Sequence, residues 1–147
     1  MLVYRITLAK WAGVLTASGQ PARWNSRGTF VLYTASSRAL ACLENVVHLS
    51  GERTGLRYKI TEIEIPDSCS KHIILPAALP KGWHKPGNYH LCQPFGDDWA
   101  AAAKSLVLVV PSAIIQDEQN ILINTAHPQL PLVSVTDIRD FTFDERL

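Results

Sequence analysis

The sequence predicts an α+β fold: one compact domain, residues 1–147, of short mixed strands with a few helices. Two observations support this prediction. Short runs of β-branched and aromatic residues recur between segments rich in turn formers, as is typical of strands. Apolar residues at helical spacing are confined to few stretches. A chain of 147 residues forms one hydrophobic core and leaves little room for a second.

The N-terminal part of the chain is expected to form two strands joined by an ordered loop. Residues 3–8 (VYRITL) alternate between apolar and polar side chains, which indicates a strand. Residues 29–33 (TFVLY) are β-branched and aromatic, which favours a second strand. Residues 19–28 between them are rich in turn-forming residues.

A helix is expected to follow the second strand. Ser36 or Ser37 provides the N-cap, and the apolar residues that follow recur at spacings of three and four. The helix should end near Leu49, before Gly51. This places Glu44 near the edge of the buried helix face.

The second half of the chain alternates strands with a long loop. Residues 56–65 show a period of two, whereas residues 76–96 contain four prolines and are expected to form a loop. Asp97 or Asp98 is expected to cap a short helix over residues 99–104. Further strands are expected at residues 106–110, 120–124 and 132–143.

Charge is distributed unevenly along the chain, although the net charge is only +1. Residues 1–60 carry eight Lys and Arg against two acidic residues, and residues 61–147 carry six against eleven. A basic half with few acids suits a compact anionic ligand such as a diphosphate held by arginines. The alternative is that the two halves simply pair across the fold.

Several classes of protein are disfavoured by the sequence. It has no Rossmann GxGxxG turn, no P-loop and no GxSxG nucleophile elbow. The five histidines and three cysteines share no metal-ligand spacing, so we expect no metal and no disulfide framework. No apolar run reaches the roughly 18 residues that cross a bilayer, and the N-terminus does not resemble a signal peptide. We therefore expect a cytoplasmic protein that does not bind membranes.

A scattered set of polar residues beside apolar strands remains as the candidate site. On chemistry alone, a purely structural role stays open for these residues. Arg5 and Glu44 would form a structural ion pair, Tyr33 would be a core aromatic, and Ser112 would serve a turn. The set consists of Arg5, Arg23, Tyr33, Glu44, Ser112 and Asn124.

Six segments of the chain, in this order, resemble the RES domain, a family named after its Arg, Glu and Ser. Each segment is short, but their order and joint spacing are specific and run from residue 4 to residue 147. Thr125 departs from the pattern, in which a proline is expected. The segments are Tyr4-Arg5, residues 19–28 (GQPARWNSRG), 31–36 (VLYTAS) leading into 39–44 (ALACLE), 110–113 (VPSA), 120–124 (NILIN) with His127-Pro128, and 143–147 (FDERL).

The resemblance implies a fold similar to that of diphtheria-toxin-type ADP-ribosyltransferases, with short strands around an NAD cleft. It implies a toxin of a bacterial toxin–antitoxin pair. The toxin would cleave the nicotinamide–ribose bond of NAD and deplete NAD by hydrolysis or by phosphorolysis with inorganic phosphate. The implied partner is an Xre-type antitoxin with a DNA-binding helix-turn-helix and a C-terminal toxin-binding domain that blocks the cleft.

The resemblance also assigns residues. Glu44 matches the catalytic glutamate, whose carboxylate would stabilise the oxocarbenium charge that develops on the ribose. Arg5, a second candidate catalytic residue, and Arg23 match the arginines that hold the NAD phosphates. Tyr33 matches the tyrosine near nicotinamide, and Ser112 matches the serine that binds phosphate or positions an arginine.

Three other readings stay open at this point. An ADP-ribosyltransferase would share every cleft residue, and the loop of residues 76–96 is expected to select the acceptor. A non-catalytic binding module would keep Arg5 and Glu44 only as an ion pair. A ribonuclease is disfavoured by the near-neutral charge and the lack of a histidine pair with a basic stripe, so we expect no direct contact with nucleic acid.

Arg27 either assists in the cleft or lies on the surface.

Overall fold

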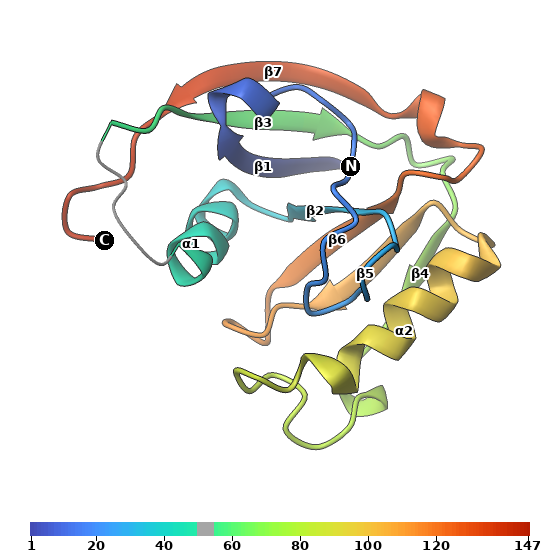
Figure 1. Cartoon of the computed structure of the whole chain (residues 1–147). Coiled ribbons are helices and arrows are strands. Elements are labelled where there is room, and N and C mark those ends of the chain that lie inside the picture. The colour runs from blue at the N-terminus through green and yellow to red at the C-terminus, as the bar shows by residue number, and fades with distance from the viewer. Residues whose placement is uncertain (50–54) are drawn as a thin grey trace.

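The computed structural model describes residues 1–49 and 55–147, and in these ranges it contains one seven-stranded sheet and two α-helices (Figure 1). The sheet order is β4-β5-β6-β2-β1-β3-β7, and only β4 and β5 run parallel to each other. Short mixed strands with two helices confirm the α+β prediction. The strands are β1 (Leu2–Leu8), β2 (Val31–Ala35), β3 (Tyr58–Glu64), β4 (Lys71–Ile73), β5 (Val107–Pro111), β6 (Gln119–Asn124) and β7 (Ser134–Phe141).

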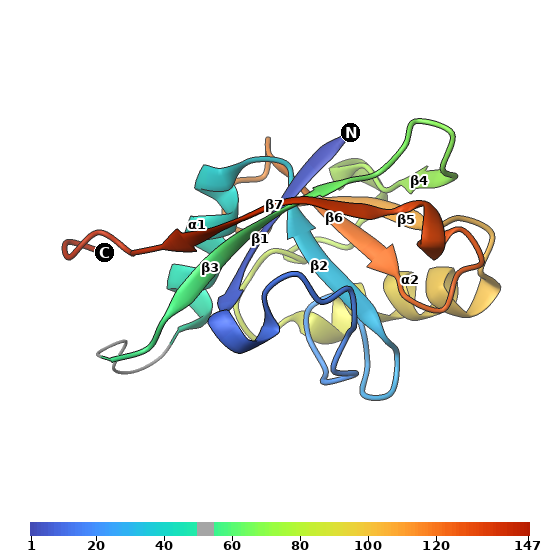
Figure 2. The same cartoon turned by 90° about the horizontal axis from the view of Figure 1, so that it is seen from above.

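The sheet consists of two halves that diverge from one point. β1 and β2 share a single register pair, Tyr4 with Ala35, whereas the other antiparallel neighbours pair over five residues or more. The half formed by β1, β3 and β7 therefore lies over β2, β6 and β5 (Figure 1, Figure 2). Apolar side chains of both halves meet in a shared core, among them Val3, Ile63, Leu32, Val109, Ile121 and Ile123.

Each helix covers a further core. Along β5 the side chains alternate: Val107 and Val109 face the shared core, and Leu108 and Val110 face α2. α1 (Arg38–His48) packs on the β1–β3 half and on the end of β2. β5 is buried on both faces, which explains its uninterrupted apolar sequence.

The first helix agrees with its prediction. Ser37 is the N-cap, and its side chain accepts a hydrogen bond from the backbone N–H of Leu40. α1 ends at His48, one residue before the expected end. Gly51, the expected stop signal, lies outside the described residues.

The second helix corrects the prediction. α2 (Tyr89–Ala102) begins within the stretch of residues 76–96 that was expected to be loop, and it ends before residue 104. The helix expected over residues 99–104 is therefore present over 99–102, but its start and its end were predicted wrongly. Asp97 and Asp98, expected as N-caps, lie inside α2.

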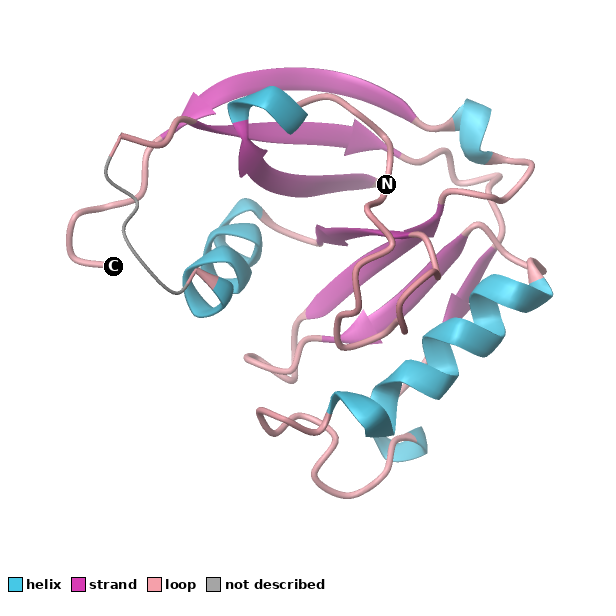
Figure 3. Ribbon diagram, viewed as in Figure 1, coloured by secondary structure: helices cyan, strands magenta, loops and turns pink. Residues whose placement is uncertain are grey.

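Tertiary packing explains why a helix forms here despite Pro94. The proline removes one backbone hydrogen bond in the second turn of α2, which disfavours a helix locally. Cys92, Phe95 and Trp99 nevertheless recur at helical spacing, and all three belong to one core cluster with residues of β5 and β6. The ribbon diagram shows α2 running along that side of the sheet (Figure 3). Burial of these side chains outweighs the missing hydrogen bond.

Smaller differences concern the strand ends. β2 begins at Val31 rather than at residue 29, and β7 occupies the middle of the expected strand over 132–143. β4 was not predicted, because three exposed residues at a sheet edge carry no periodic signal. In the described ranges, no helix is both long and apolar enough to cross a membrane.

Candidate active site

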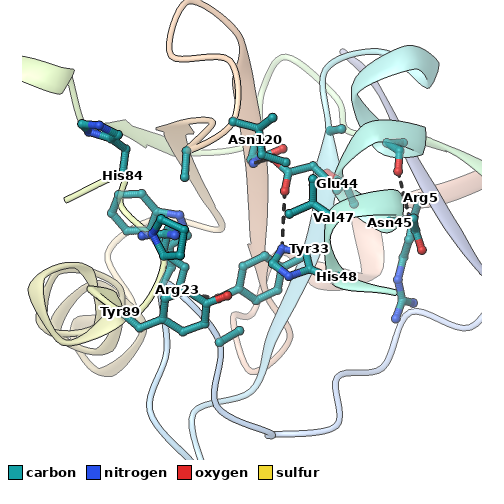
Figure 4. Close-up of a pocket in the computed structure, with 18 of the residues that line it drawn as sticks. Arg5, Arg23, Tyr33, Glu44, Asn45, Val47, His48, His84, Tyr89 and Asn120 are labelled. Atoms are coloured by element: carbon teal, nitrogen blue, oxygen red, sulfur yellow. Dashed lines mark hydrogen bonds and ion pairs between the residues drawn. The ribbon is translucent and has the colours of Figure 1, made fainter. Parts of the chain in front are cut away.

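A cavity of about 660 Å³ lies between α1, the segment of residues 21–24 and the segment that leads into α2 (Figure 4). Small-molecule sites commonly have volumes of about 300–1,000 Å³. Among the described residues that line it, Glu44 is the only acidic side chain, whereas two arginines take part. Four of the predicted site residues therefore meet on one cavity: Arg5, Arg23, Tyr33 and Glu44.

Glu44 projects from α1, and its carboxylate is held by side chains at the ends of β5 and β6. Its Oε1 accepts hydrogen bonds from Ser112 Oγ at 2.9 Å and from Asn120 Nδ2 at 2.6 Å. Its Oε2 lies 3.6 Å from Nε2 of His48, one helical turn further along α1. Burial raises the pKa of Glu44, but the hydrogen bonds from His48, Asn120 and Ser112 outweigh it, so the pKa lies below its ordinary value. Glu44 is therefore an ionised acceptor at neutral pH.

Ser112 lies behind Glu44 rather than on the cavity wall. The residue is fully buried just after β5, and its Oγ accepts hydrogen bonds from the backbone N–H groups of Ile114 and Ile115. Both lone pairs of the hydroxyl are thus occupied, and its single proton is donated to Glu44. The expected contact of Ser112 with a phosphate or an arginine is replaced here by contact with the carboxylate.

Asn120 and His48 were missed by the sequence analysis. Both side chains line the cavity and both contact Glu44. For His48, the i,i+4 spacing from Glu44 on a predicted helix was an available signal. Asn120 stood inside a quoted motif, but pairing with a helix residue 76 positions away has no local signature.

Arg5 lies on β1, and its side chain lines the cavity; among the described residues, no acidic side chain forms an ion pair with it. Its Nη1 donates to the carbonyl oxygen of Val14 at 3.3 Å. Burial lowers the pKa of Arg5. Arg5 and Glu44 line the same cavity but form no ion pair, so the structural pair considered above is absent between these two described residues. A half-buried guanidinium without a carboxylate is suited to binding an anion.

Arg23 and Arg5 lie on opposite sides of Tyr33 (Figure 4). Arg23 Nη1 donates to the carbonyl oxygen of Trp83 at 2.6 Å, and its guanidinium stacks 4.6 Å from the ring centre of Tyr89. Two longer hydrogen bonds reach the carbonyl oxygen of Lys85. These contacts orient Arg23 and join its loop to the segment before α2.

Tyr33 lies on β2, and its hydroxyl is fixed by two hydrogen bonds. It donates to Asn25 Oδ1 at 2.7 Å and accepts from the backbone N–H of Trp24 at 3.0 Å. Burial raises the pKa of Tyr33, so the hydroxyl remains protonated at neutral pH. Asn25 is itself buried and donates to three backbone carbonyl groups of its own loop, which stiffens this wall of the cavity.

The last two candidates lie outside the cavity lining. Arg27 is exposed, and its Nη1 donates to Gln20 Oε1 at 3.0 Å. Asn124 is buried, donates to the carbonyl oxygen of Ala100 and accepts from the backbone N–H of Ala126, so it braces the connection after β6. In the described part of the chain, no group of three His, Cys, Asp or Glu side chains is arranged to hold a metal ion.

The segment of residues 76–96, expected to select the acceptor, contributes three residues to the cavity wall: His84, Pro86 and Tyr89. His84 and Tyr89 lie opposite α1, across the cavity from Glu44 (Figure 4).

Comparison with known proteins places this geometry in a family. A profile described as "RES domain" matches residues 2–144. A protein of Sphingobium sp. (strain YBL2) named "Prs ADP-ribosylating toxin" is 40% identical over 127 residues, which cover 85% of this chain and 79% of that protein. "Toxin Res" of Yersinia enterocolitica is 34% identical over 153 aligned positions, covering 100% of this chain and 99% of the relative.

A solved structure supports the fold. The crystal structure of the M. tuberculosis MbcT–MbcA toxin–antitoxin complex contains a chain that superposes with a TM-score of 0.78. The match covers 96% of this chain and 84% of that chain at 18% sequence identity. The arrangement of strands and helices around the cavity is therefore shared with that structure.

Proposed function

This chain belongs to the RES-domain family, and we propose on that premise that it is a toxin that breaks the bond between nicotinamide and ribose in NAD. The observation that carries the proposal is the ionised Glu44 carboxylate, anchored on the wall of a cavity that also presents Arg5 and Arg23. One carboxylate and two arginines match the charges that develop or reside on NAD during this reaction.

The bond-breaking step requires stabilisation of positive charge on the ribose. When the nicotinamide leaves with the bonding electron pair, C1′ and the ring oxygen acquire oxocarbenium character. A fixed carboxylate nearby stabilises this charge more strongly than it stabilises the ground state. Glu44 is suited to this role because its pKa is held low and its orientation is set by Ser112 and Asn120.

The two arginines are suited to the diphosphate. A guanidinium can meet phosphate oxygens with two parallel hydrogen bonds. Arg5 has no acidic partner within 4 Å among the described residues, so its charge is available to an anion. Arg23 is already oriented by Trp83 and Tyr89. Tyr33 lies between the two arginines, where its ring face is suited to stacking near nicotinamide.

Water or inorganic phosphate is the acceptor in the leading form of this proposal, so that NAD is consumed. Transfer of ADP-ribose to a protein is a second candidate, and it is favoured by one observation. The Sphingobium relative, at 40% identity, carries the name of an ADP-ribosylating toxin. Both reactions begin with the same bond cleavage and use the same cavity.

The proposed partner is an antitoxin of the Xre type that covers the cavity through its C-terminal domain. The solved structure with the same fold is a toxin–antitoxin complex, which supports a partner of this kind. Val47 and His48 line the cavity and are more than half exposed, so they lie where a covering chain would contact the wall. Co-expression and co-purification with an antitoxin of the Xre type tests this partner.

The test of the function is release of nicotinamide from NAD by the purified chain, with and without inorganic phosphate, beside a folded Glu44→Gln variant. The expected result is release that falls by about 100-fold or more in the variant, because the substitution removes the charge but keeps the shape. A requirement for phosphate identifies phosphorolysis. ADP-ribose attached to purified Prs, the protein in the name of the Sphingobium relative, with little free product, identifies transfer. If Glu44→Gln changes only stability and the wild type releases nothing, the protein is a binding module.

A further inference from the structure

The two oxygens of the Glu44 carboxylate have different surroundings. Oε1 accepts two hydrogen bonds, from Ser112 and Asn120, which use both of its lone pairs. Among the hydrogen bonds and ion pairs of the described residues, Oε2 has one contact, with Nε2 of the exposed His48 side chain at 3.6 Å. One oxygen of the carboxylate is thus fixed by hydrogen bonds to residues of the sheet, and the other can accept a hydrogen bond from a ligand.

The backbone of Asn120 is held by strands on both sides. Its strand, β6, lies inside the sheet, and Asn120 pairs with Ala35 of β2 on one side and with Val110 of β5 on the other. A side chain on a backbone held from both sides has little freedom to follow a moving partner. Glu44, by contrast, projects from a helix by a flexible side chain, so the amide of Asn120 sets the position that Glu44 takes.

Ser112 is a less clean probe of this anchoring. Its hydroxyl also accepts the backbone N–H groups of Ile114 and Ile115, so its removal disturbs the turn after β5 as well as Glu44. Among the described residues, the one hydrogen bond that Asn120 Nδ2 donates goes to Glu44.

We propose that Asn120 is a positioning residue: it fixes Oε1 of Glu44 and so leaves Oε2 as the oxygen that meets the ribose. This inference rests on the proposed function for the identity of the substrate. Without Asn120 the carboxylate loses its shortest hydrogen bond and can rotate, so that the oxygen facing the ribose is no longer defined. The same loss removes a donor that favours the ionised form, so the pKa of Glu44 rises.

The test compares the wild type with Asn120→Ala, Asn120→Asp and a control, Asn124→Ala. The control removes an asparagine from the same strand that bonds only backbone groups, and so reports any general loss of stability. The Glu44 pKa is measured by ¹³C NMR titration of the side-chain carboxyl carbon, assigned with Glu44→Gln. Nicotinamide release then gives kcat and KM for each variant.

The expected result is a raised Glu44 pKa in Asn120→Ala and a further rise in Asn120→Asp, which places a like charge against Oε1. We expect kcat to fall about tenfold to a hundredfold, with KM changed less than about threefold, because a hydrogen bond to a charged group is lost. Asn124→Ala should leave the Glu44 pKa unchanged. The groups around Glu44 that remain in place in every variant are His48, Arg5, Arg23, His84 and Ser112.

An unchanged Glu44 pKa and an unchanged kcat in folded Asn120→Ala would overturn the proposal, and equal shifts in Asn124→Ala would do so too. Asn120→Asp nearly preserves the shape of the side chain, so it decides the question where the alanine variant fails to fold. If the wild type releases no nicotinamide, the proposed function has failed, and the NMR titration still decides whether Asn120 holds Glu44.

Discussion

Replacing Gly96 by alanine tests the contact that joins α2 to the loop carrying Arg23. A Cβ atom at position 96 would lie 1.7 Å from the carbonyl oxygen of Trp24 and 2.8 Å from its carbonyl carbon. Both are backbone atoms, so no side-chain rotation relieves the clash. Contacts of a Cβ atom below 3.0 Å are essentially never seen, so helix and loop must separate by at least the 1.3 Å between 1.7 and 3.0 Å.

Three contributions set the change in the free energy of unfolding, one stabilising and two destabilising. Alanine is a better helix former than glycine by about 1 kcal/mol, which would stabilise α2. Overpacking costs roughly 1–3 kcal/mol. The separation also strains the hydrogen bonds from Gln93 to Ala22 and from Ser26 to Asp97, each contributing about 1 kcal/mol. We expect a net loss of about 2 kcal/mol, which lowers Tm by roughly 4–8 °C for a chain of this size.

Urea and thermal unfolding of Gly96→Ala and wild type measure this loss, with Ala101→Gly as the matched control. Ala101 is an exposed position of the same helix, so its variant reports helix propensity alone. Nicotinamide release should fall together with stability, because the displaced loop carries Arg23 into the cavity. If Gly96→Ala is as stable as the wild type or more so, the close approach of Trp24 is refuted.

Two further predictions concern Tyr33 and Glu44. Tyr33→Phe leaves Asn25 Oδ1 and the Trp24 N–H without their partner, and the free energy of unfolding should fall by about 1–3 kcal/mol in urea titrations; an unchanged value would contradict these hydrogen bonds. The pKa of Glu44 lies below its ordinary value of 4.5, so its ionised form stabilises the fold above that value, and this contribution is lost as the pH falls through the lowered pKa. The stability advantage of wild type over Glu44→Gln should therefore be present near pH 6 and shrink below about pH 4, and an advantage that grows on acidification would contradict the ionised state.

Local patterns predicted most of the fold because most elements satisfy their local rules. Residues 58–64 form the predicted strand, Ser37 caps α1, and the apolar run of β5 is buried on both faces. The prediction of α2 failed because a local and a tertiary signal disagree. Pro94 favours a loop, whereas burial of Trp99 and its neighbours against the sheet favours a helix. These side chains are buried against strands that are distant in the sequence, so a short stretch of sequence does not show that they are buried.

The candidate site was predicted unevenly for the same reason. Glu44, Arg5, Arg23 and Tyr33 line one cavity, and the roles that the resemblance assigns to them stay predictions. Ser112 was predicted as a site residue, but its contact with Glu44 spans 68 positions and depends on the ends of β5 and α1 meeting. Arg27 belongs to the same motif as Arg23, yet its side chain turns to Gln20 on the surface.

The two sides of the cavity differ in what holds them, and this difference bears on the acceptor. Glu44 and Asn120 come from α1 and from a strand paired on both sides, so the group proposed to act on the ribose is fixed by the core of the fold. Arg23 and residues 84–88 lie in connecting segments, and Arg23 is held by backbone carbonyl groups of the second segment and by the ring of Tyr89, the first residue of α2. Connecting segments change more readily than the elements they join. A family that keeps the first wall and varies the second would keep bond cleavage and change what receives the ADP-ribose. Exchange of residues 84–89 between this chain and a relative with a different acceptor should therefore alter the product of the reaction more than its dependence on Glu44.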